Sequence, residues 1–202
     1  MVAIIRYNAG NIQSVSYAFE RLGVPARVTD DPEEIRGAER VIFPGVGEAS
    51  SAMRYLRARG LDRLIPDLKQ PVLGICLGMQ LMCRHSEEND TDCLGIFDES
   101  VRLFRSSDSD GRLRHKVPQI GWNQIYDLRT DLFRDVAEGS YCYFVHGYYA
   151  GLGDHTIART DYIAPYSSAI QRGNFYGLQF HPEKSAGTGE QILKNFVGSK
   201  AG

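Results

Sequence analysis

A single cysteine between two glycines places the strongest constraint on the fold of this chain. The segment 74–78 (sequence GICLG) follows a short apolar run and precedes good helix formers at 79–82. This order predicts a buried strand, a sharp turn and a helix. At such a turn Cys76 is accessible to substrate, and the dipole of the following helix favours its reactive thiolate. From this segment alone, a free cysteine that only packs in the core is an equally good interpretation.

Strands and helices alternate in the first half of the chain. Strands are expected at 2–6, 26–29, 40–43 and 71–75, and helices after Asn11, around 52–56 and over 61–68. Asn11 precedes apolar residues at helical spacing and is expected to cap that helix. The alternation predicts an α/β fold with a mostly parallel central sheet, helices on both faces and a site at the carboxyl ends of the strands.

The second half of the chain is richer in strands. They are expected at 101–104, 123–126, 141–146, 155–159, 167–171 and 175–180, and a closing helix is expected at 189–197. The polar segment 106–114 is expected to form a surface loop. Because the sequence shows no repeat and no linker, we expect one domain over residues 1–202.

A second motif far downstream favours a catalytic role for Cys76. It is His181-Pro182-Glu183. If this tripeptide is extended, its first and third side chains lie on the same side of the backbone. The glutamate can then hold one imidazole nitrogen and leave the other to face a thiol. The three residues therefore form a candidate nucleophile, base and orienting carboxylate.

Composition and charge exclude several classes of protein. The chain has 23 basic and 25 acidic residues, which argues against a nucleic-acid or membrane-surface partner. It has no long apolar run, and its first residues are typical of a strand, so we expect a cytoplasmic protein. The spacing of the cysteines does not indicate disulfides, and Cys83, Cys93 and Cys142 are expected only to pack. We expect no metal and no cofactor.

Three further segments contain candidate substrate contacts. The turn at 45–47 follows a strand, and one of its N–H groups, with that of Leu77, could form an oxyanion hole. Gln80 lies four residues after Cys76, so both share one helix face. The aromatic segment 143–149 leads into a turn. Taken singly, these features also fit an ordinary loop, a solvated helix residue and a packed strand.

Together these motifs resemble those of the class I glutamine amidotransferases. The resemblance rests on the cysteine segment 74–80 and the histidine segment 179–185. More narrowly, the chain is similar to the glutaminase subunits of imidazole glycerol phosphate synthases, which act in histidine biosynthesis. Further matching segments are 7–11, 44–47, 121–123 and 143–146, so the resemblance extends nearly end to end. The Pro-Gly-Val-Gly at 44–47 is the sharpest discriminator, because sister glutaminases usually carry Pro-Gly-Gly there.

The resemblance implies a flavodoxin-like fold and the hydrolysis of glutamine to glutamate and ammonia through a thioester. It assigns catalysis to Cys76, His181 and Glu183, the oxyanion hole to Leu77 with Gly45, Val46 and Gly47, and substrate binding to Gln80, Gly147 and Tyr148. It also implies a partner, which is a cyclase subunit of the (β/α)8-barrel type. That subunit would receive ammonia through a channel and form imidazole glycerol phosphate and aminoimidazole carboxamide ribotide, with Asn11, Trp122 and Lys184 facing it.

At three positions the sequence departs from the pattern of these relatives. Arg6 and Asn8 replace the usual Asp and Gly near the expected partner contact. Gly147 replaces a Ser or Thr, so a hydroxyl contact to glutamine is missing or is made by the backbone. These departures concern partner contact and substrate affinity and leave the three candidate catalytic residues intact.

Other functions compete with this interpretation. A cysteine hydrolase of the same superfamily would share the turn at Cys76, and a glutaminase subunit could serve another acceptor synthase. A non-catalytic scaffold is disfavoured because all three candidate catalytic residues are present. A zinc deaminase is excluded, since its P-C-x-x-C ligand pair is absent. Finally, the two glycines around Val46 suggest a peptide that turns its N–H into the site only when the partner binds.

Overall fold

The computed structural model describes residues 1–8, 11–105 and 116–199. Its main element is a seven-stranded sheet with the order β11-β12-β13-β4-β3-β1-β2. The strands are β1 (Val2–Ile5), β2 (Ala26–Thr29), β3 (Arg40–Phe43), β4 (Val72–Ile75), β11 (Thr156–Asp161), β12 (Pro165–Arg172) and β13 (Phe175–Leu178). Neighbours from β2 to β13 pair in parallel, and β12 and β11 continue the sheet antiparallel. The expected α/β fold with a mostly parallel sheet is confirmed.

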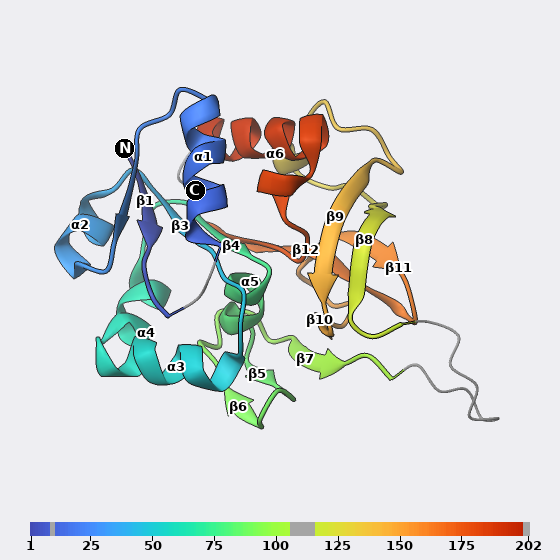
Figure 1. The fold of residues 1–202 in the computed structure, drawn as a ribbon, viewed down its shortest axis with the longest axis horizontal. Helices are drawn as coiled ribbons and strands as arrows, with labels where there is room; N and C mark the ends of the chain where they lie inside the picture. Colours follow the sequence, from blue (N-terminus) through green and yellow to red (C-terminus); the bar gives the residue numbers. More distant parts are fainter. Residues whose placement is uncertain (9–10, 106–115, 200–202) are drawn as a thin grey trace.

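Helices cover both faces of this sheet (Figure 1). They are α1 (Ile12–Arg21) and α6 (Ala186–Gly198) on one face, and α2 (Pro32–Gly37), α3 (Ala49–Ala58), α4 (Leu61–Leu64) and α5 (Leu77–Met82) on the other. The strands serve both layers because their side chains alternate. In β1, Ala3 and Ile5 pack with α3, whereas Val2 and Ile4 pack with α1. Both faces are therefore closed, and the carboxyl edge of the sheet is left for a site.

The second half of the described chain adds two smaller sheets. A four-stranded sheet has the order β10-β7-β5-β6, and β8 pairs with β9 in antiparallel fashion. Their bounds are β5 (His85–Ser86), β6 (Thr91–Asp92), β7 (Ser100–Leu103), β8 (Gln119–Gln124), β9 (Tyr141–His146) and β10 (Tyr148–Ala150). The expected strand-rich second half is therefore confirmed, although the short strands β5, β6 and β10 were not expected.

Several expected boundaries are wrong. The strand expected at 123–126 is β8, which ends at Gln124 because the next residues pair with other segments. The helix expected over 61–68 stops at Leu64 and continues as a 3-10 turn, Ile65–Asp67, since Pro66 lacks an N–H for an α-helix. The strand expected to reach residue 180 ends at Leu178, and α6 begins three residues before the expected 189.

Asn11 stands at the start of α1 but does not cap it with its side chain. Its backbone is left-handed, with φ of 69°, and no side-chain cap bond forms. Its amide instead donates from Nδ2 to Glu183 Oε1 at 2.5 Å. Asn11 therefore stands at the expected N-cap position, but its side chain is turned toward a distant carboxylate and does not bond the first turn of the helix.

Part of the expected organisation lies outside the described residues. The loop expected at 106–114 lies outside the described residues, and so do residues 9–10 of the motif at 7–11. Within the described ranges, none of the helices has the length and apolar character that crossing a membrane requires.

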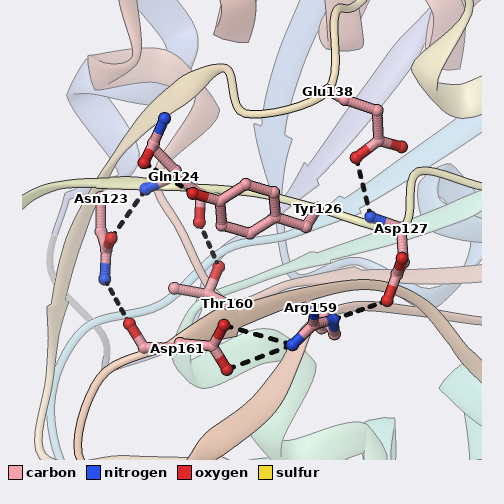
Figure 2. Close-up of polar contacts among 8 residues, drawn as sticks. All are labelled: Asn123, Gln124, Tyr126, Asp127, Glu138, Arg159, Thr160 and Asp161. Carbon is pink, nitrogen blue, oxygen red and sulfur yellow. Dashed lines mark hydrogen bonds and ion pairs between the residues drawn. The ribbon is translucent and has the colours of Figure 1, made fainter.

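Polar side chains fasten one end of the β8–β9 pair to β11 (Figure 2). Asn123 Nδ2 donates to the carbonyl oxygen of Asp161 at 3.0 Å, and Thr160 Oγ1 donates to that of Gln124 at 2.9 Å. Arg159 of β11 adds an ion pair with Asp127, in the segment that follows β8, at 2.6 Å. The two-stranded sheet is thus held against the main sheet at several points, which keeps its free face in a fixed place.

Candidate active site

Cys76 occupies a sharp turn at the carboxyl end of the central strand β4. Its φ of 53° and ψ of −107° are unusual for a residue with a side chain, and α5 begins at the next residue. The turn requires the glycine on its far side, because a Cβ at Gly78 would overlap the carbonyl oxygen of Phe43. The strand, turn and helix expected around the cysteine are present, and the strained backbone is typical of a reactive side chain held outward.

His181 and Glu183 meet Cys76 because β13 pairs in parallel with β4. The chain leaves both strands at the same edge of the sheet. His181 Nδ1 lies 2.8 Å from Glu183 Oε1, and both side chains are almost completely buried. The tripeptide is not extended as expected: residues 182–184 form a 3-10 turn. The turn still joins the two side chains, because it brings the carboxylate back over the imidazole.

The buried imidazole is held next to two negative groups. Burial by itself lowers the pKa of His181, but the charges and hydrogen bonds of the Cys76 thiolate and the Glu183 carboxylate outweigh burial and raise it. Apart from the Cys76 sulfur, His181 Nε2 has no hydrogen-bond partner among the described residues. In the thiol form, Cys76 Sγ donates to the carbonyl oxygen of Val145 at 3.7 Å. The arrangement can therefore support a thiolate–imidazolium pair.

The expected oxyanion-hole segment lies beside the cysteine, but one of its donors is occupied. The Leu77 N–H donates to the carbonyl oxygen of Gly45 at 3.2 Å. Gly45 is tightly placed, since a Cβ there would overlap the hydroxyl of Tyr7. That buried hydroxyl donates to the carbonyl oxygen of Pro44 at 2.6 Å. Tyr7 therefore fixes the start of this segment, whereas Gly47, with φ of 131°, lies at its free end.

A cavity of about 400 Å³ opens in front of Cys76. It is lined by Val46, Gly47, Cys76, Leu77, Gln80, Glu88, Pro118, Val145, His146, Gly147 and Tyr148. All the residues expected to bind substrate are among these, together with most of the expected oxyanion-hole segment. The volume is at the lower end of the range for small-molecule sites.

Gln80 lies in the wall of this cavity rather than free in it. The side chain is buried, and its Nε2 donates to the carbonyl oxygen of Tyr148 at 2.9 Å and to Gln179 Oε1 at 3.0 Å. Both N–H groups of the amide are thus used within the protein. Of the Gln80 amide, only the oxygen is left for a ligand.

The family of the chain follows from comparison with known proteins. The model of the family "Glutamine amidotransferase class-I" matches residues 4–199. The chain belongs to the class I glutamine amidotransferases. Among the relatives of this amidotransferase, imidazole glycerol phosphate synthase subunit HisH of Bacteroides fragilis is 55% identical over 196 residues, which cover 97% of this chain and 98% of that one. HisH of Shewanella loihica is 46% identical over 209 residues, covering 98% and 91% of the two chains.

Solved structures share the fold of this amidotransferase at low sequence identity. A crystal structure described as a glutamine amidotransferase has a TM-score of 0.73 at 17% identity, covering 98% of both chains. A glutamine amidotransferase from Thermotoga maritima has a TM-score of 0.64 at 19% identity, covering 98% of this chain and 82% of that one. At these identities the likeness concerns the fold alone.

The three residues expected to face a partner differ in their positions relative to the amidotransferase site. Trp122 is 53% exposed on β8, and Lys184 is exposed directly after Glu183. Tyr143 of β9 pairs with Trp122 and bonds through its backbone to the segment 181–185 that contains Lys184. Asn11 lies against Glu183 from the opposite end of the sequence.

Three residues of the amidotransferase site were not expected from the sequence. Glu88 lines the cavity, where burial raises the pKa of its carboxyl group, and it accepts a hydrogen bond from the Ala49 N–H at 2.7 Å. Tyr7 holds the oxyanion segment, and Gln179 contacts both Gln80 and Cys76 Sγ. Tyr7 and Gln179 lie within the matching segments 7–11 and 179–185, so a signal was present for them, whereas Glu88 carried none.

Proposed function

We propose that this chain is the glutaminase subunit of an imidazole glycerol phosphate synthase in histidine biosynthesis. The observation that carries the proposal is its 55% identity to a HisH subunit over nearly the full length of both chains. The site supports it, because a buried His181–Glu183 pair lies beside Cys76 at the wall of a cavity suited to an amino acid. As in this family, the chain forms one domain, acts in the cytoplasm and needs no cofactor or metal.

The proposed reaction follows from the positions of the three side chains. The Cys76 thiolate attacks the carboxamide carbon of glutamine and forms a tetrahedral intermediate. His181 gives the proton on Nε2 to the leaving nitrogen, so ammonia departs and a thioester remains. His181 then takes a proton from water, whose oxygen attacks the thioester and releases glutamate and the thiolate. Glu183 keeps the imidazole oriented and stabilises its positive charge throughout.

The cavity offers complementary groups for the rest of the substrate. Glu88 is the carboxylate on its wall, and we assign it to the α-ammonium group of glutamine. Gln80 Oε1 is the oxygen left free by the two N–H bonds of that amide. The backbone at Gly147 and Tyr148 would hold the substrate without the hydroxyl that relatives usually place at residue 147. A Cβ at Gly147 would meet its nearest neighbours at 3.8 Å, so the site has room for that hydroxyl.

The occupied Leu77 N–H supports the idea that the oxyanion hole is gated. While this N–H donates to Gly45, it is not free to stabilise an oxyanion. Rotation of the peptides at 45–47 would release it and turn the N–H of Val46 toward the site. We propose that the partner and its ligand favour this rotated state, so that glutamine is hydrolysed only when ammonia has an acceptor.

The partner is proposed to bind over the outer face of the β8–β9 pair. This outer face consists of Ile120, Trp122, Tyr141, Tyr143 and Val145. Ile120 is 64% exposed and Trp122 is 53% exposed, whereas such large apolar side chains are normally covered. Val145 also lines the cavity, so a partner on this face would lie over the site. The family suggests a (β/α)8-barrel cyclase subunit that receives ammonia through a channel.

The proposal is tested by measuring glutamate formation from glutamine. The purified chain is assayed alone, with the cyclase subunit of the same organism, and with that subunit plus its ribotide ligand; Cys76→Ala is the control. Activity that rises on the order of a hundredfold in the full complex and is lost in the control is expected. Equal activity with and without the partner would contradict the gating. No activity in any mixture would instead favour a cysteine hydrolase or another acceptor synthase.

A further inference from the structure

A continuous set of buried polar side chains leads from the substrate cavity to the sulfur of Cys76. Gln179 is completely buried, and Gln80 and His146 are 5% and 6% exposed. His146 Nδ1 lies 2.7 Å from the carbonyl oxygen of Tyr148, the same oxygen that accepts from Gln80. Gln80 then donates to Gln179, and Gln179 Nε2 lies 3.7 Å from Cys76 Sγ. Burying polar groups is costly unless they are paired, so this set of bonds must be maintained together.

The direction of every bond in this set is fixed by one backbone group. The carbonyl oxygen of Tyr148 can only accept, so the side chain of Gln80 must present its nitrogen there. The second N–H of that amide then donates to Gln179 Oε1, which leaves Gln179 Nε2 facing the sulfur. Reversing Gln80 would set its oxygen against the Tyr148 carbonyl oxygen, and reversing Gln179 would set its NH2 group against that of Gln80. The group next to Cys76 Sγ is therefore an N–H donor.

His146 strengthens this directionality because it stays neutral. Burial lowers its pKa to about 4, so near pH 7 one nitrogen carries a proton and the other does not. The proton lies on Nδ1, since the Tyr148 carbonyl oxygen beside it can only accept. Both acceptor directions of that oxygen are thus taken, by His146 and by Gln80.

Two polar groups beside Cys76 Sγ favour opposite ionisation states of the cysteine. The carbonyl oxygen of Val145 accepts from the Sγ–H and favours the neutral thiol, whereas an N–H donor favours the thiolate. We propose that Gln179 is a positioning residue that donates its N–H to the Cys76 thiolate and keeps it ionised against the Val145 carbonyl. The inference rests on Cys76 as the nucleophile of the proposed function, and it adds a third determinant of that thiolate beside His181 and the helix terminus.

The test follows the ionisation of Cys76 through its alkylation, which needs neither glutamine nor a partner. The full chain is treated with iodoacetamide across a range of pH, and modification of Cys76 is followed by mass spectrometry of its peptide. Gln179→Met keeps the shape and removes the donor, and Gln179→Glu places an oxygen against the sulfur. Gln191→Glu, at a partly buried position of α6 remote in sequence from the cysteine, is the control.

For Gln179→Met the midpoint of the alkylation profile is expected to rise by about one pH unit, which is a tenfold loss of thiolate below the midpoint. Gln179→Glu is expected to raise it further, and Gln191→Glu to leave it unchanged. Gln80→Met, which removes the bond that orients Gln179, is expected to give a smaller rise and serves if a Gln179 variant does not fold. A folded Gln179→Met protein with the wild-type profile, whatever its melting temperature, would overturn the proposal. An altered profile in a chain that hydrolyses no glutamine would instead refute only the glutaminase function.

Discussion

The surroundings of Cys76 and the outer face of the β8–β9 pair both depart from the rule that polar side chains are exposed and apolar ones buried, and they depart from it in opposite ways. Around Cys76 the protein buries amides, an imidazole and a carboxylate, and each has a specific partner. On the outer face it exposes Ile120 and Trp122 to solvent. Both reversals cost stability in the isolated chain. The proposed function accounts for both, as a substrate site and as a partner surface.

Both regions meet on one strand. In β9, Cys142, Phe144 and His146 point inward, and Tyr141, Tyr143 and Val145 point outward. Because side chains alternate along a strand, these six residues supply part of the core and part of the outer face, and the strand reaches the cavity at Val145 and His146. Val145 of the outer face and the inward His146 both line the cavity, so the outer face continues directly into the mouth of the site.

The largest effect is expected at the buried carboxylate. Glu183→Gln keeps an oxygen that can accept from His181 Nδ1 and from Asn11. The substitution therefore removes the negative charge and preserves the hydrogen-bond geometry. In the complex with the partner we expect kcat to fall on the order of a thousandfold with little change in KM. The Glu183 charge raises the pKa of His181. Without that charge the imidazolium loses its proton at a lower pH, so the alkaline limb of the pH–activity profile should shift to lower pH in the variant.

The kinetics of Glu183→Gln are compared with those of Glu190→Gln, a carboxylate on the exposed side of α6 paired with Lys194. Wild-type kcat in Glu183→Gln would remove this residue from the proposed catalytic set. Equal losses in both variants would mean that the charge acts over a distance rather than through the imidazole.

A smaller effect is expected where the oxyanion segment meets Tyr7. Gly45→Ala would place a Cβ against the Tyr7 hydroxyl and displace the segment, so we expect about a hundredfold loss of kcat. Adding Tyr7→Phe removes the obstructing oxygen and should restore part of the rate. The matched control is Gly37→Ala, where a Cβ has open space. If the double variant is no faster than Gly45→Ala, the segment is not displaced by this contact.

The smallest of the three effects concerns the outer face. Trp122→Ala should raise the Kd for the cyclase subunit by about thirtyfold, or about 2 kcal/mol, as for a central aromatic residue of an interface. Because Trp122 is exposed, the free energy of unfolding of the free chain should change by less than about 0.5 kcal/mol. Titration calorimetry and urea unfolding measure the two quantities. Leu152→Ala, which is 49% exposed away from this face, should change neither; a larger effect there would place the partner elsewhere.

What the sequence predicted best depended on short-range pattern. The strand and helix around Cys76 and the alternation in the first half follow from residues a few positions apart. Helix α2 has such a signal as well, because Asp31 precedes Pro32 and accepts a hydrogen bond from the N–H of Glu33. This helix was nevertheless absent from the expected elements.

What the sequence did not predict depended on contacts between distant residues. Asn11 is an ordinary helix cap by local pattern, yet Glu183, near the other end of the chain, takes its amide. Glu88 has no motif, and it reaches the cavity because β5 and β6 fold back beside α3. The hydrogen bond between Gln80 and Gln179 likewise joins residues that are neighbours only in the folded sheet.

The pairing of β4 with β13 has a consequence for how such a protein can change during evolution. Gly74 lies opposite Gly177, so the segments with the cysteine and the histidine are neighbours in the sheet. About half of the chain lies between them in the sequence and forms an excursion that begins after β4 and ends at β13. That excursion includes β8 and β9 with their outer face. Insertions and substitutions in β8 and β9 leave the cysteine and histidine segments joined by their backbones. Under the proposed function, changes confined to the outer face can therefore fit the protein to a different partner, as long as the cavity residues of the same segment, such as Gln80 and Glu88, are kept.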